Sequence, residues 1–469
     1  MPKNALIWLR NDLRVADNPA LTEALRCDGT ATALYIEETD PALRPLGGAA
    51  RWWLHQSLNR MARDLAALGV KVSVRRGRAA EVLDTAIAET GAGAVFWNRR
   101  YGAAERALDE SIKADLKQRG LKCQSFNAGL LVEPWEIATG QGKPYSVFTP
   151  FWKSLKARDI EAALPAPGGR PPIAFEPVDT AYVEPFWARK LGQHWRIGEA
   201  AAREAAADFL DGPLRDYPQG RDFPHSMATS RLSPHLRFGE ISPRQLWQAA
   251  GSMAQAEPAL AGAADKFLSE LAWRDFSYHL LYHRENIATE PMQAKYRAMP
   301  WRQDEAGLSA WQRGQTGLPI VDAGMRQLWE TGWMHNRVRM LVASLLAKNL
   351  LIDWRLGEQW FWDTLVDADP ASNPASWQWV AGSGADAAPY FRIFNPVTQG
   401  ERFDADGDYV RTWVPELARL PDQWVQKPFE APQEVLRKAG VALGKDYPEP
   451  IVDLKTSRVR ALEALKEAG

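Results

Sequence analysis

Short apolar runs alternate with amphipathic stretches along the first third of the chain. The apolar runs predict buried strands, because each is short and bounded by polar or turn-forming residues; they cover 5–9, 31–36, 70–74, 92–97 and 123–131. Between several of them, the apolar positions recur with helical spacing, over 51–68, 79–89 and 104–119. Strands that alternate with helices predict an α/β fold with a doubly wound, parallel, five-stranded, Rossmann-like sheet.

The pattern changes after a proline-rich segment. Six prolines fall between residues 164 and 185, and proline removes a backbone donor and blocks helix. Beyond about residue 195 the spacing is helical nearly throughout, for example over 198–209, 264–283, 318–331, 336–351 and 433–439. We therefore predict an α/β domain over 1–131, a proline-rich connector over 132–195 and a larger all-α domain over 196–469.

Composition and charge exclude several classes of protein. The formal net charge of −1 means that a nucleic-acid partner would need a local basic patch. Cys27 and Cys123 are the only cysteines, which excludes a disulfide scaffold, a Cys-rich zinc site and a four-cysteine iron–sulfur cluster, and we expect no metal. The start lacks the apolar core of a signal peptide and no apolar run is long enough to span a membrane, so we expect a cytoplasmic protein.

Tryptophan is unusually frequent, with 21 residues, 13 of them after residue 240. A large core accounts for some of them, since tryptophan buries much area. Tryptophan also stacks on planar ligands and is easily oxidised, so a helical half this rich in it is also typical of a flat cofactor or of electron transfer. No P-loop, HExxH or GxSxG motif is present, which leaves kinase and hydrolase functions with little support.

Two segments of the helical half have polar residues at unusual positions. Tyr217 and the run 229–234 precede a helix start, where hydroxyls and free N–H groups make either an anion site or a simple N-cap. Further on, a carboxylate, an indole, a guanidinium and a hydroxyl share one helical face, at Glu270, Trp273, Arg274 and Ser277. Such a mixture suits a lined pocket better than a core stripe.

Two further segments combine amides, acids and aromatic residues. Asn336 and Met340 are one helical turn apart, so an amide and a thioether face the same way; His335 beside them is more often structural than catalytic. In the segment 367–379, two acids and an asparagine precede two tryptophans. A polar loop that caps a helix would explain part of this segment, but not so many polar and aromatic residues together.

Together these blocks resemble the photolyase/cryptochrome family, and within it the bacterial photolyases of classes I and III. The blocks are TSRLSP (229–234), ELAWRDF (270–276), TGWMHNRVRM (331–340) and SWQWVAGSGADAAPYFRIFNP (376–396). The opening WLRNDLR (8–14) followed by DNP (17–19) also resembles the family's start. We know of no other family with these blocks in this order.

The resemblance implies that the helical domain binds FAD in its reduced form. The residues that it assigns to the cofactor are Tyr217, Thr229, Ser230, Arg231, Leu232, Ser233, Arg274, Asn336, Arg339, Asp367, Asp369 and Asn373. Tyr217 and the run 229–233 would hold the phosphates, and Asp369 the isoalloxazine edge. Arg339 and Asp367 would pair near N5, and Asn373 would face N5. Asparagine there is typical of the repair enzymes and favours an anionic reduced flavin, whereas plant-type cryptochromes tend to carry aspartate.

The resemblance also implies a lesion pocket and an electron-transfer chain. The pocket would consist of Glu270, Trp273, Asn336, Met340 and Trp379, with Arg221 and Arg337 on DNA phosphates. The chain would run from the flavin to the surface through Trp377, Trp354 and Trp301, while Trp311 and Trp333 are either side branches or core. Catalysis would rest on Glu270, Asn336 and these three tryptophans.

The function implied is light-driven repair of cyclobutane pyrimidine dimers, a carbon–carbon lyase reaction. Excited reduced FAD would pass an electron to the dimer, the ring would open, and the electron would return. The partner would be UV-damaged DNA, and we expect a monomer with no membrane and no obligate protein partner. A (6-4) photolyase would carry His-His where this chain has His335 and Asn336. Blue-light sensors often carry a long C-terminal extension, which we do not expect here because the chain ends soon after residues 446–452. A flavoprotein that binds DNA without repairing it remains a third alternative.

A second chromophore is expected in the α/β domain. Folate-using members have an Asn-Glu-Arg segment where this chain has Ala104, Glu105 and Arg106. Glu105 is therefore the expected antenna contact, and methenyltetrahydrofolate the first candidate, with a deazaflavin or an empty site as alternatives. Trp52 and Trp53 would either stack on the antenna or belong to the core.

Overall fold

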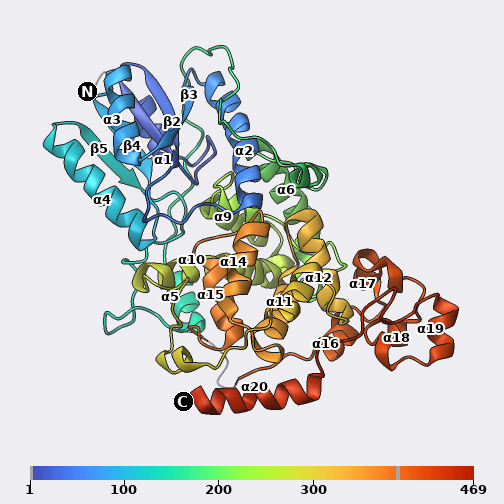
Figure 1. The fold of residues 1–469 in the computed structure, drawn as a ribbon. Helices are drawn as coiled ribbons and strands as arrows, with labels where there is room; N and C mark the ends of the chain where they lie inside the picture. The colour runs from blue at the N-terminus through green and yellow to red at the C-terminus, as the bar shows by residue number, and fades with distance from the viewer. Residues whose placement is uncertain (1–3, 387–390, 469) are drawn as a thin grey trace. The chain divides into compact units, whose positions relative to one another are not determined.

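The computed structural model describes residues 4–386 and 391–468 (Figure 1). The chain forms two compact units, each built from separate stretches of sequence. The first unit contains Met1–Arg215 and Ser230–Glu285, and the second contains Asp216–Thr229 and Asn286–Gly469. The domain boundaries predicted at residues 131 and 195 divide the chain differently and remain a proposal.

A parallel five-stranded sheet forms the core of the first unit (Figure 1). Its strands are β1 (Ala5–Leu9), β2 (Ala31–Glu38), β3 (Lys71–Gly77), β4 (Ala94–Asn98) and β5 (Lys122–Phe126). Their order is β3-β2-β1-β4-β5, so Ile7 pairs with Ala33 on one side and with Phe96 on the other. The order reverses at β1, as in doubly wound folds, which confirms the predicted fold class.

Helices cover both faces of this sheet. On one face, α3 (Ala79–Thr90) and α4 (Ala103–Gln118) pack on side chains that alternate along the strands. The core residues on this face include Leu6, Trp8, Leu34, Ile36, Val95 and Trp97. The intervening residues Ala5, Ile7 and Leu9 are also buried, and α1 (Pro19–Leu25) lies against β1 and β4. Burial on both faces explains why the strands are apolar runs without alternation.

Several elements of the first unit differ from the prediction, and two of them have a clear local cause. The last strand ends at Phe126 and not at residue 131, because the side chain of Asn127 accepts from the backbone N–H groups of Gly129 and Leu130 and turns the chain. Helix α1 was not predicted, since it has only 7 residues. It begins at Pro19, after Asn18, whose side chain accepts from the N–H of Leu21.

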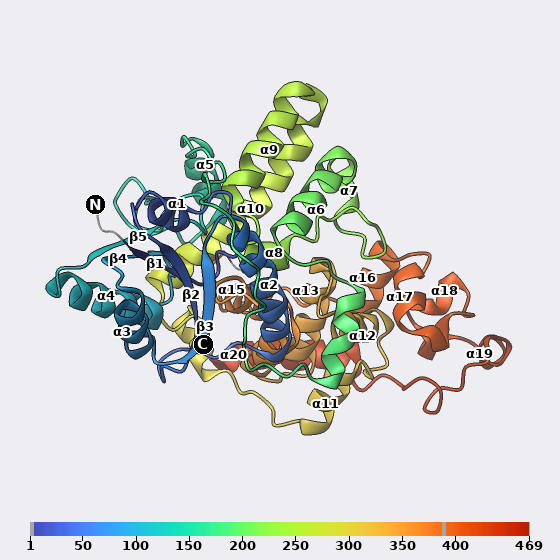
Figure 2. The ribbon, with the colours of Figure 1, turned by 90° about the horizontal axis from the view of Figure 1, so that it is seen from above.

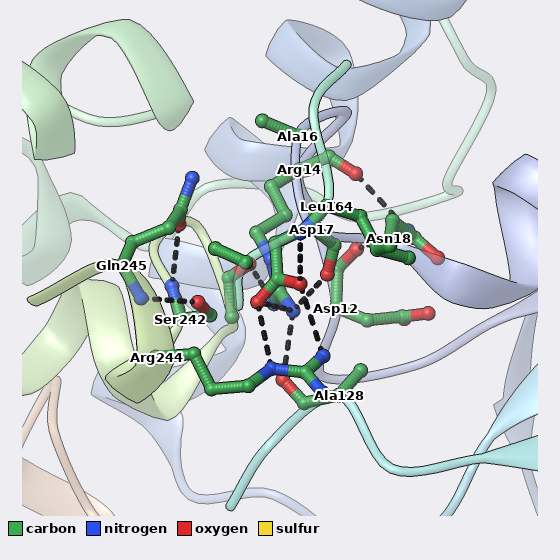
Figure 3. Close-up of polar contacts among 12 residues, drawn as sticks. Asp12, Arg14, Ala16, Asp17, Asn18, Ala128, Leu164, Ser242, Arg244 and Gln245 are labelled. Carbon is green, nitrogen blue, oxygen red and sulfur yellow. Dashed lines mark hydrogen bonds and ion pairs between the residues drawn. The ribbon is translucent and has the colours of Figure 1, made fainter. Parts of the chain in front are cut away.

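A buried polar network ties the loop after β1 to α9 (Pro243–Ala256) (Figure 3). Arg244 donates through Nε and Nη2 to the two carboxylate oxygens of Asp17, at 3.1 and 3.0 Å. Arg14 donates to the backbone oxygens of Asp17 and Ala128, at 2.6 and 2.7 Å. The residues 8–19 that resemble the family's opening therefore hold the first unit together, and loss of one buried partner costs about 3–5 kcal/mol.

The helices of the first unit present part of the predicted site. Helix α10 (Ala261–His283) carries Glu270, Trp273 and Arg274, and it lies beside α9 and α5 (Phe148–Lys156) (Figure 2). The other helices of this unit are α2 (Gly48–Ala67), α6 (Glu199–Asp211) and the short α8 (Ser233–Arg237). The proline-rich stretch 164–185 has no helix or strand, as predicted.

The second unit is helical in the part of the chain that the structure describes. Its helices are α7 (Tyr217–Gly220), α11 (Glu305–Arg313), α12 (Pro319–Thr331), α13 (Asn336–Ser344), α14 (Trp354–Thr364), α15 (Ser372–Ala381), α16 (Pro396–Phe403), α17 (Asp408–Trp413), α18 (Asp422–Val425), α19 (Gln433–Ala439) and α20 (Leu454–Ala468). The helix predicted over 336–351 is α13 followed by a π-helical segment, Leu345–Asn349. Within the described ranges, no helix is long and apolar enough to cross a bilayer.

Candidate functional site

The second unit brings a buried carboxylate against a guanidinium. Nη2 of Arg339, on α13, lies 2.8 Å from Oδ2 of Asp367, which follows α14, and Nε of Arg339 donates to the backbone oxygen of Met334 at 2.8 Å. Asp367 is buried, and its other oxygen, Oδ1, has no hydrogen-bond partner among the described residues. Buried polar atoms in proteins are nearly always satisfied, so an unpaired one is evidence for an additional binding partner.

Asp369 and Asn373 lie at the start of α15. Oδ1 of Asp369 accepts from the backbone N–H groups of Ala371 and Ser372, at 2.9 and 2.8 Å, which fixes the turn that enters the helix. Asn373, in the first helical turn, donates from Nδ2 to Oε1 of Glu358 at 2.8 Å. The segment 367–373 therefore places two acids and an amide at one helix end.

Trp377 is buried one turn further along α15. Its ring meets those of Phe361 and Trp311 edge-to-face, with centroids 5.1 and 6.1 Å apart. A Cβ at Gly357 would lie 2.1 Å from this indole, so only glycine allows α14 and α15 to approach this closely. Nε1 of Trp377 has no hydrogen-bond partner within the described residues.

The other tryptophans of the predicted chain lie in the same unit. Trp354, at the start of α14, is buried, and Trp301 is half-buried against Tyr296, Met299 and α20. Exposure thus increases from Trp377 and Trp354 to Trp301, which is the order expected of a path from an interior cofactor to the surface. Nε1 of Trp311 donates to the backbone oxygen of Val342 at 2.9 Å, which is typical of a core tryptophan.

The lesion residues predicted in the second unit lie at helix surfaces. Asn336 is the exposed first residue of α13, and Met340, one turn later, is half-buried. Trp379 is half-buried on α15, and its Nε1 donates to the backbone oxygen of Asp386 at 3.0 Å. It also lines a small pocket with Lys348 and Phe391. The block quoted as 376–396 includes residues 387–390, which lie outside the described residues.

A cluster of arginines surrounds His335 in the second unit. Burial, with help from the nearby Arg339, Arg221 and Arg337, lowers the pKa of His335 to about 4, against the opposing effect of Asp222. Arg337 pairs with Asp222 at 2.8 Å, and its Nε has no hydrogen-bond partner among the described residues. Three arginines therefore lie near one imidazole in the second unit, two of them paired with acids.

Helix α10 presents the two lesion residues predicted in the first unit, Glu270 and Trp273, and the cofactor residue Arg274 on one face. The indole of Trp273 stacks on Phe148, with centroids 3.8 Å apart and planes 10° from parallel. Glu270 accepts from Nζ of Lys266 at 2.9 Å. Arg274 donates to the backbone oxygen of Gly129 and lies over the ring of Tyr278 at 4.9 Å.

The residues predicted to hold phosphates belong to both units. In the second unit, Tyr217 is buried at the start of α7, and the guanidinium of Arg221 lies 5.4 Å from its ring. In the first unit, the N–H of Leu232 donates to the hydroxyl of Ser230, and Ser233 begins α8. Arg231 has a φ of 51° and lies over Trp195 at 4.4 Å.

The predicted antenna residues are engaged in structural contacts. Oε2 of Glu105 accepts from the N–H of Gly102 at 3.1 Å and closes the first turn of α4. Nε1 of Trp52 donates to Glu184 at 2.9 Å, and Nε1 of Trp53 donates to Glu240 at 3.2 Å. Both tryptophans are buried, as the core alternative predicted.

Sequence reasoning missed a buried cationic cluster at the carboxyl ends of β1 and β4. The guanidinium of Arg10 lies 3.6 Å from the ring of Trp8 and pairs with Asp109 at 2.8 Å. Its Nε and Nη2 have no hydrogen-bond partner among the described residues. Arg100, after β4, pairs with Glu38. The sequence gives no direct signal for this cluster, because the reversal of strand order between β1 and β4, where doubly wound sheets bind ligands, is seen only in the folded sheet.

Glu358 and Phe148 were also missed. Glu358 is buried on α14 beside Asn373, and Phe148 on α5 supports Trp273. The sequence does contain a signal for Glu358, because it lies three to four residues from Trp354, Phe361 and Trp362 and so shares their helix face. A carboxylate on an apolar helix face needs a buried partner.

Comparison with known proteins identifies two family domains. The domain described as DNA photolyase matches residues 5–168, and the FAD binding domain of DNA photolyase matches residues 267–467. Together they cover most of the chain.

Full-length relatives agree with these domains. A deoxyribodipyrimidine photo-lyase of Agrobacterium fabrum is 49% identical, over 98% of this chain and 97% of that protein. Cryptochrome-1 of Arabidopsis thaliana is 37% identical, over 99% of this chain and 70% of that protein. The crystal structure of a class III photolyase from Agrobacterium tumefaciens superposes with a TM-score of 0.95 at 47% identity, covering 100% of this chain and 98% of that one.

Proposed function

We propose, from the premise that this chain belongs to the DNA photolyase and cryptochrome family, that it repairs cyclobutane pyrimidine dimers in DNA with light. The observation that carries the proposal is the group at the start of α15. There Asp367, which pairs with the guanidinium of Arg339 and keeps one oxygen without a partner among the described residues, lies six residues before the fixed amide of Asn373 in the second unit. These groups fit the polar edge of a reduced flavin.

FAD, when bound, would supply the excited electron donor, and the chain's residues would hold and orient it. Asp369 would contact the isoalloxazine edge, the Arg339–Asp367 pair would balance charge near N5, and Asn373 would face N5. The assignments to the phosphates are Tyr217, Thr229, Ser230, Arg231, Leu232 and Ser233. Arg274 is assigned along the cofactor, and Asn336 to both cofactor and lesion.

The lesion would leave the duplex and be recognised by stacking, for which Trp273 and Trp379 are the assigned residues. Dimers are easier to extrude than intact base pairs, and an extruded base is recognised by stacking and by hydrogen bonds to its edge. Glu270 and Asn336 would supply those hydrogen bonds, and Met340 would fill the apolar side. A hydrogen bond donated by the carboxyl group of Glu270 would also stabilise negative charge on the dimer as the ring opens.

DNA phosphates would be neutralised by the arginines around His335. Arg221 and Arg337 lie close enough to perturb the same imidazole, so they form one patch. Phosphate contacts position a duplex without reading its sequence, which suits an enzyme whose target is damage.

Flavin that has become oxidised would be returned to its reduced form through Trp377, Trp354 and Trp301. The support for this path is the rise in exposure from the first two residues to the third and their common location in the second unit. Trp377 would deliver the electron to the flavin, and a reductant in solution would reduce the oxidised Trp301.

A second chromophore would bind at the carboxyl end of the sheet. Arg10, with two guanidinium nitrogens that no described residue engages, suits an anionic antenna such as methenyltetrahydrofolate or a deazaflavin. Glu105 remains the expected family contact. Burial lowers the pKa of Arg10, against the effect of Asp109, so a bound anion would stabilise the charged guanidinium.

A blue-light sensor is the second candidate, because a cryptochrome is 37% identical to this chain. Equilibrium binding of DNA in the dark distinguishes the repair enzyme from the blue-light sensor without any photochemistry. The purified protein, with its flavin content measured, would be titrated with duplexes that carry a cyclobutane dimer, a (6-4) product or no lesion. A repair enzyme of the proposed class should prefer the cyclobutane duplex, and equal affinity for all three would contradict the proposal. We expect a cytoplasmic monomer.

A further inference from the structure

A lysine side chain is buried in the second unit without a carboxylate beside it. Lys348 lies in the π-helical segment Leu345–Asn349 and is only 2% exposed. Its Nζ donates to the backbone oxygen of Arg392 and lies 4.2 Å from the centroid of the Phe391 ring. Among the described residues, no acid forms an ion pair with this amine. Buried lysines are nearly always paired, so this one calls for a further explanation.

The π-helical segment holds the amine in one place. The N–H of Leu350 donates to the backbone oxygen of Leu345, five residues earlier, at 2.9 Å. The hydroxyl of Ser344, just before the segment, accepts from the N–H of Phe394 at 3.2 Å. Together with the hydrogen bond from Nζ, this contact fixes the segment against the stretch 392–394. Single π-helical turns of this kind are frequent at functional sites.

The amine lies at a pocket that is partly open to solvent. The pocket has a volume of about 320 Å³, and aromatic rings form most of its wall, those of Tyr296, Trp379, Phe391 and Phe394. Arg392 lines it too, and its guanidinium lies 4.6 Å from the ring of Phe394. Within the described ranges, Arg392 has no carboxylate partner either. Two cations and no anion therefore line one pocket that a small molecule can enter.

The position of this amine makes it a nucleophile at neutral pH. Burial, with help from the charge of Arg392, lowers the pKa of Lys348 to about 7. At pH 7 about half of these amines are therefore neutral, against about one in 3,000 for a lysine with the ordinary pKa of 10.5. Only the neutral amine has a lone pair with which to attack an electrophile.

We propose that Lys348 is a site at which dissolved carbon dioxide reversibly forms a carbamate. The lone pair of Nζ attacks the carbon of carbon dioxide, the electron pair of one carbon–oxygen π bond moves to oxygen, and one proton leaves Nζ for solvent. Nothing is oxidised or reduced. The product carries one negative charge, and the hydrogen that stays on the nitrogen can still donate to the backbone oxygen of Arg392.

The surroundings of the amine favour this product. The carbamate changes the side chain of Lys348 from a cation to an anion, and it gives the guanidinium of Arg392 the counter-ion that it lacks. Carbon dioxide has three atoms and no charge, so it can enter a pocket with aromatic walls. A bound inorganic anion would instead require the charged ammonium, which burial disfavours.

Carbon-13 NMR of the purified protein tests the proposal. The protein would be equilibrated with labelled bicarbonate at pH 7, and its carbamate signals compared between variants. The N-terminal amine, with an ordinary pKa of about 8, gives a signal that all variants share. We expect one further signal in the parent that is lost in Lys348→Met. Methionine keeps the apolar stem, and an apolar group in place of a buried charge is often tolerated.

The matched control is Lys295→Met. Lys295 is exposed, and its Nζ lies 5.1 Å from the centroid of the Tyr296 ring, which also lines the pocket. This control should keep every carbamate signal of the parent. The same set of signals in the parent and in Lys348→Met, or loss of the further signal in Lys295→Met, overturns the proposal.

A second measurement needs no variant and decides the question if Lys348→Met does not fold. Triethyloxonium converts a carbamate into a stable ethyl ester, which mass spectrometry of peptides locates in the sequence. The ester should be found on Lys348 in buffer with carbon dioxide and not in buffer free of it. Ester on the N-terminal amine or on exposed lysines alone overturns the proposal. Neither measurement uses light or DNA, so a negative result leaves the proposed function untouched.

Discussion

The indole of Trp273 lies flat on the ring of Phe148, with centroids 3.8 Å apart and planes 10° from parallel. Phe148 is buried on α5, whereas Trp273 is half-buried on α10. Phe148 thus covers one face of the Trp273 indole, on which the lesion is proposed to stack. The stacked pair holds the indole in one orientation, so less side-chain freedom is lost when a base packs on it.

Replacing Phe148 with leucine should weaken lesion binding without changing flavin content. Leucine keeps apolar volume but loses the ring stack, worth about 0.5–1.5 kcal/mol, so we expect about two- to tenfold lower affinity for a dimer-containing duplex. Equilibrium binding measures this, with Phe148→Tyr as the control that retains the stack. Unchanged affinity in the leucine variant would show that Trp273 does not need this support.

Replacing Trp377 with phenylalanine should leave FAD bound but block its photoreduction. Phenylalanine fills most of the space between Phe361 and Trp311, yet it is far harder to oxidise than tryptophan. Absorbance of the oxidised flavin would be followed under blue light with a reductant in solution. Trp413→Phe, on α17, is the matched control and should photoreduce normally. Normal photoreduction by the Trp377 variant would remove it from the chain.

Replacing Glu270 with alanine should lower repair yield severalfold with flavin binding intact. A hydrogen bond to a charged group is worth about 1.5–3 kcal/mol, and this one would be strongest as charge develops on the dimer. The variant Glu270→Gln can still donate a hydrogen bond to the dimer, so its repair yield should lie between those of the parent and of the alanine variant. Repair per absorbed photon is the measurement, and a parental yield for the alanine variant would exclude Glu270 from the pocket.

Replacing Arg337 with glutamine should lower the affinity of the protein for damaged and for undamaged DNA by the same factor. Removal of one phosphate contact lowers the slope of log affinity against log salt by about 0.9. The pair with Asp222 is also lost, so the thermal stability of the variant must be checked beside its binding. A selective loss for damaged DNA, with an unchanged salt slope, would place Arg337 on the lesion and not on the backbone.

Acid should destabilise the second unit through His335. Its folded-state pKa of about 4 lies below the unfolded value near 6.5, so the unfolded state binds the proton first and stability is lost as pH falls from 6.5 toward 4. Between pH 7 and 5 this amounts to about 2 kcal/mol. His335→Asn cannot titrate and still caps α13 by accepting from Arg337. The free energy of unfolding, measured with denaturant at pH 7 and at pH 5, should fall less with pH in the variant than in the parent. An equal fall in both proteins would exclude His335 as the cause.

Local pattern predicted the fold well where burial alone decides structure. The strand Ala5–Leu9 and the helix Gln433–Ala439 have the predicted bounds, because their apolar spacing is unambiguous. The strand at Lys122–Phe126 was predicted too long, since a side-chain turn at Asn127 ends it and apolar spacing does not report such turns. The π-helical turn at Leu345–Asn349 has no local signature either.

Motifs predicted one contact of the candidate site, and another contact could be found only in the tertiary structure. The pair of Arg339 and Asp367 was expected, and the structure places it at 2.8 Å. Glu358 lies 15 residues from Asn373 in sequence, and nothing local links them. Their contact depends on how α14 packs on α15, which neither helix encodes alone.

Light-driven repair is the measurement that tests the central claim most directly. Protein with fully reduced flavin would be mixed with oligothymidine that contains cyclobutane dimers and illuminated with near-UV or blue light, while absorbance at the thymine band is followed. We predict that the band recovers in the light and not in the dark. No recovery, with reduced FAD confirmed in the sample, would contradict the assignment of this chain as a cyclobutane dimer photolyase.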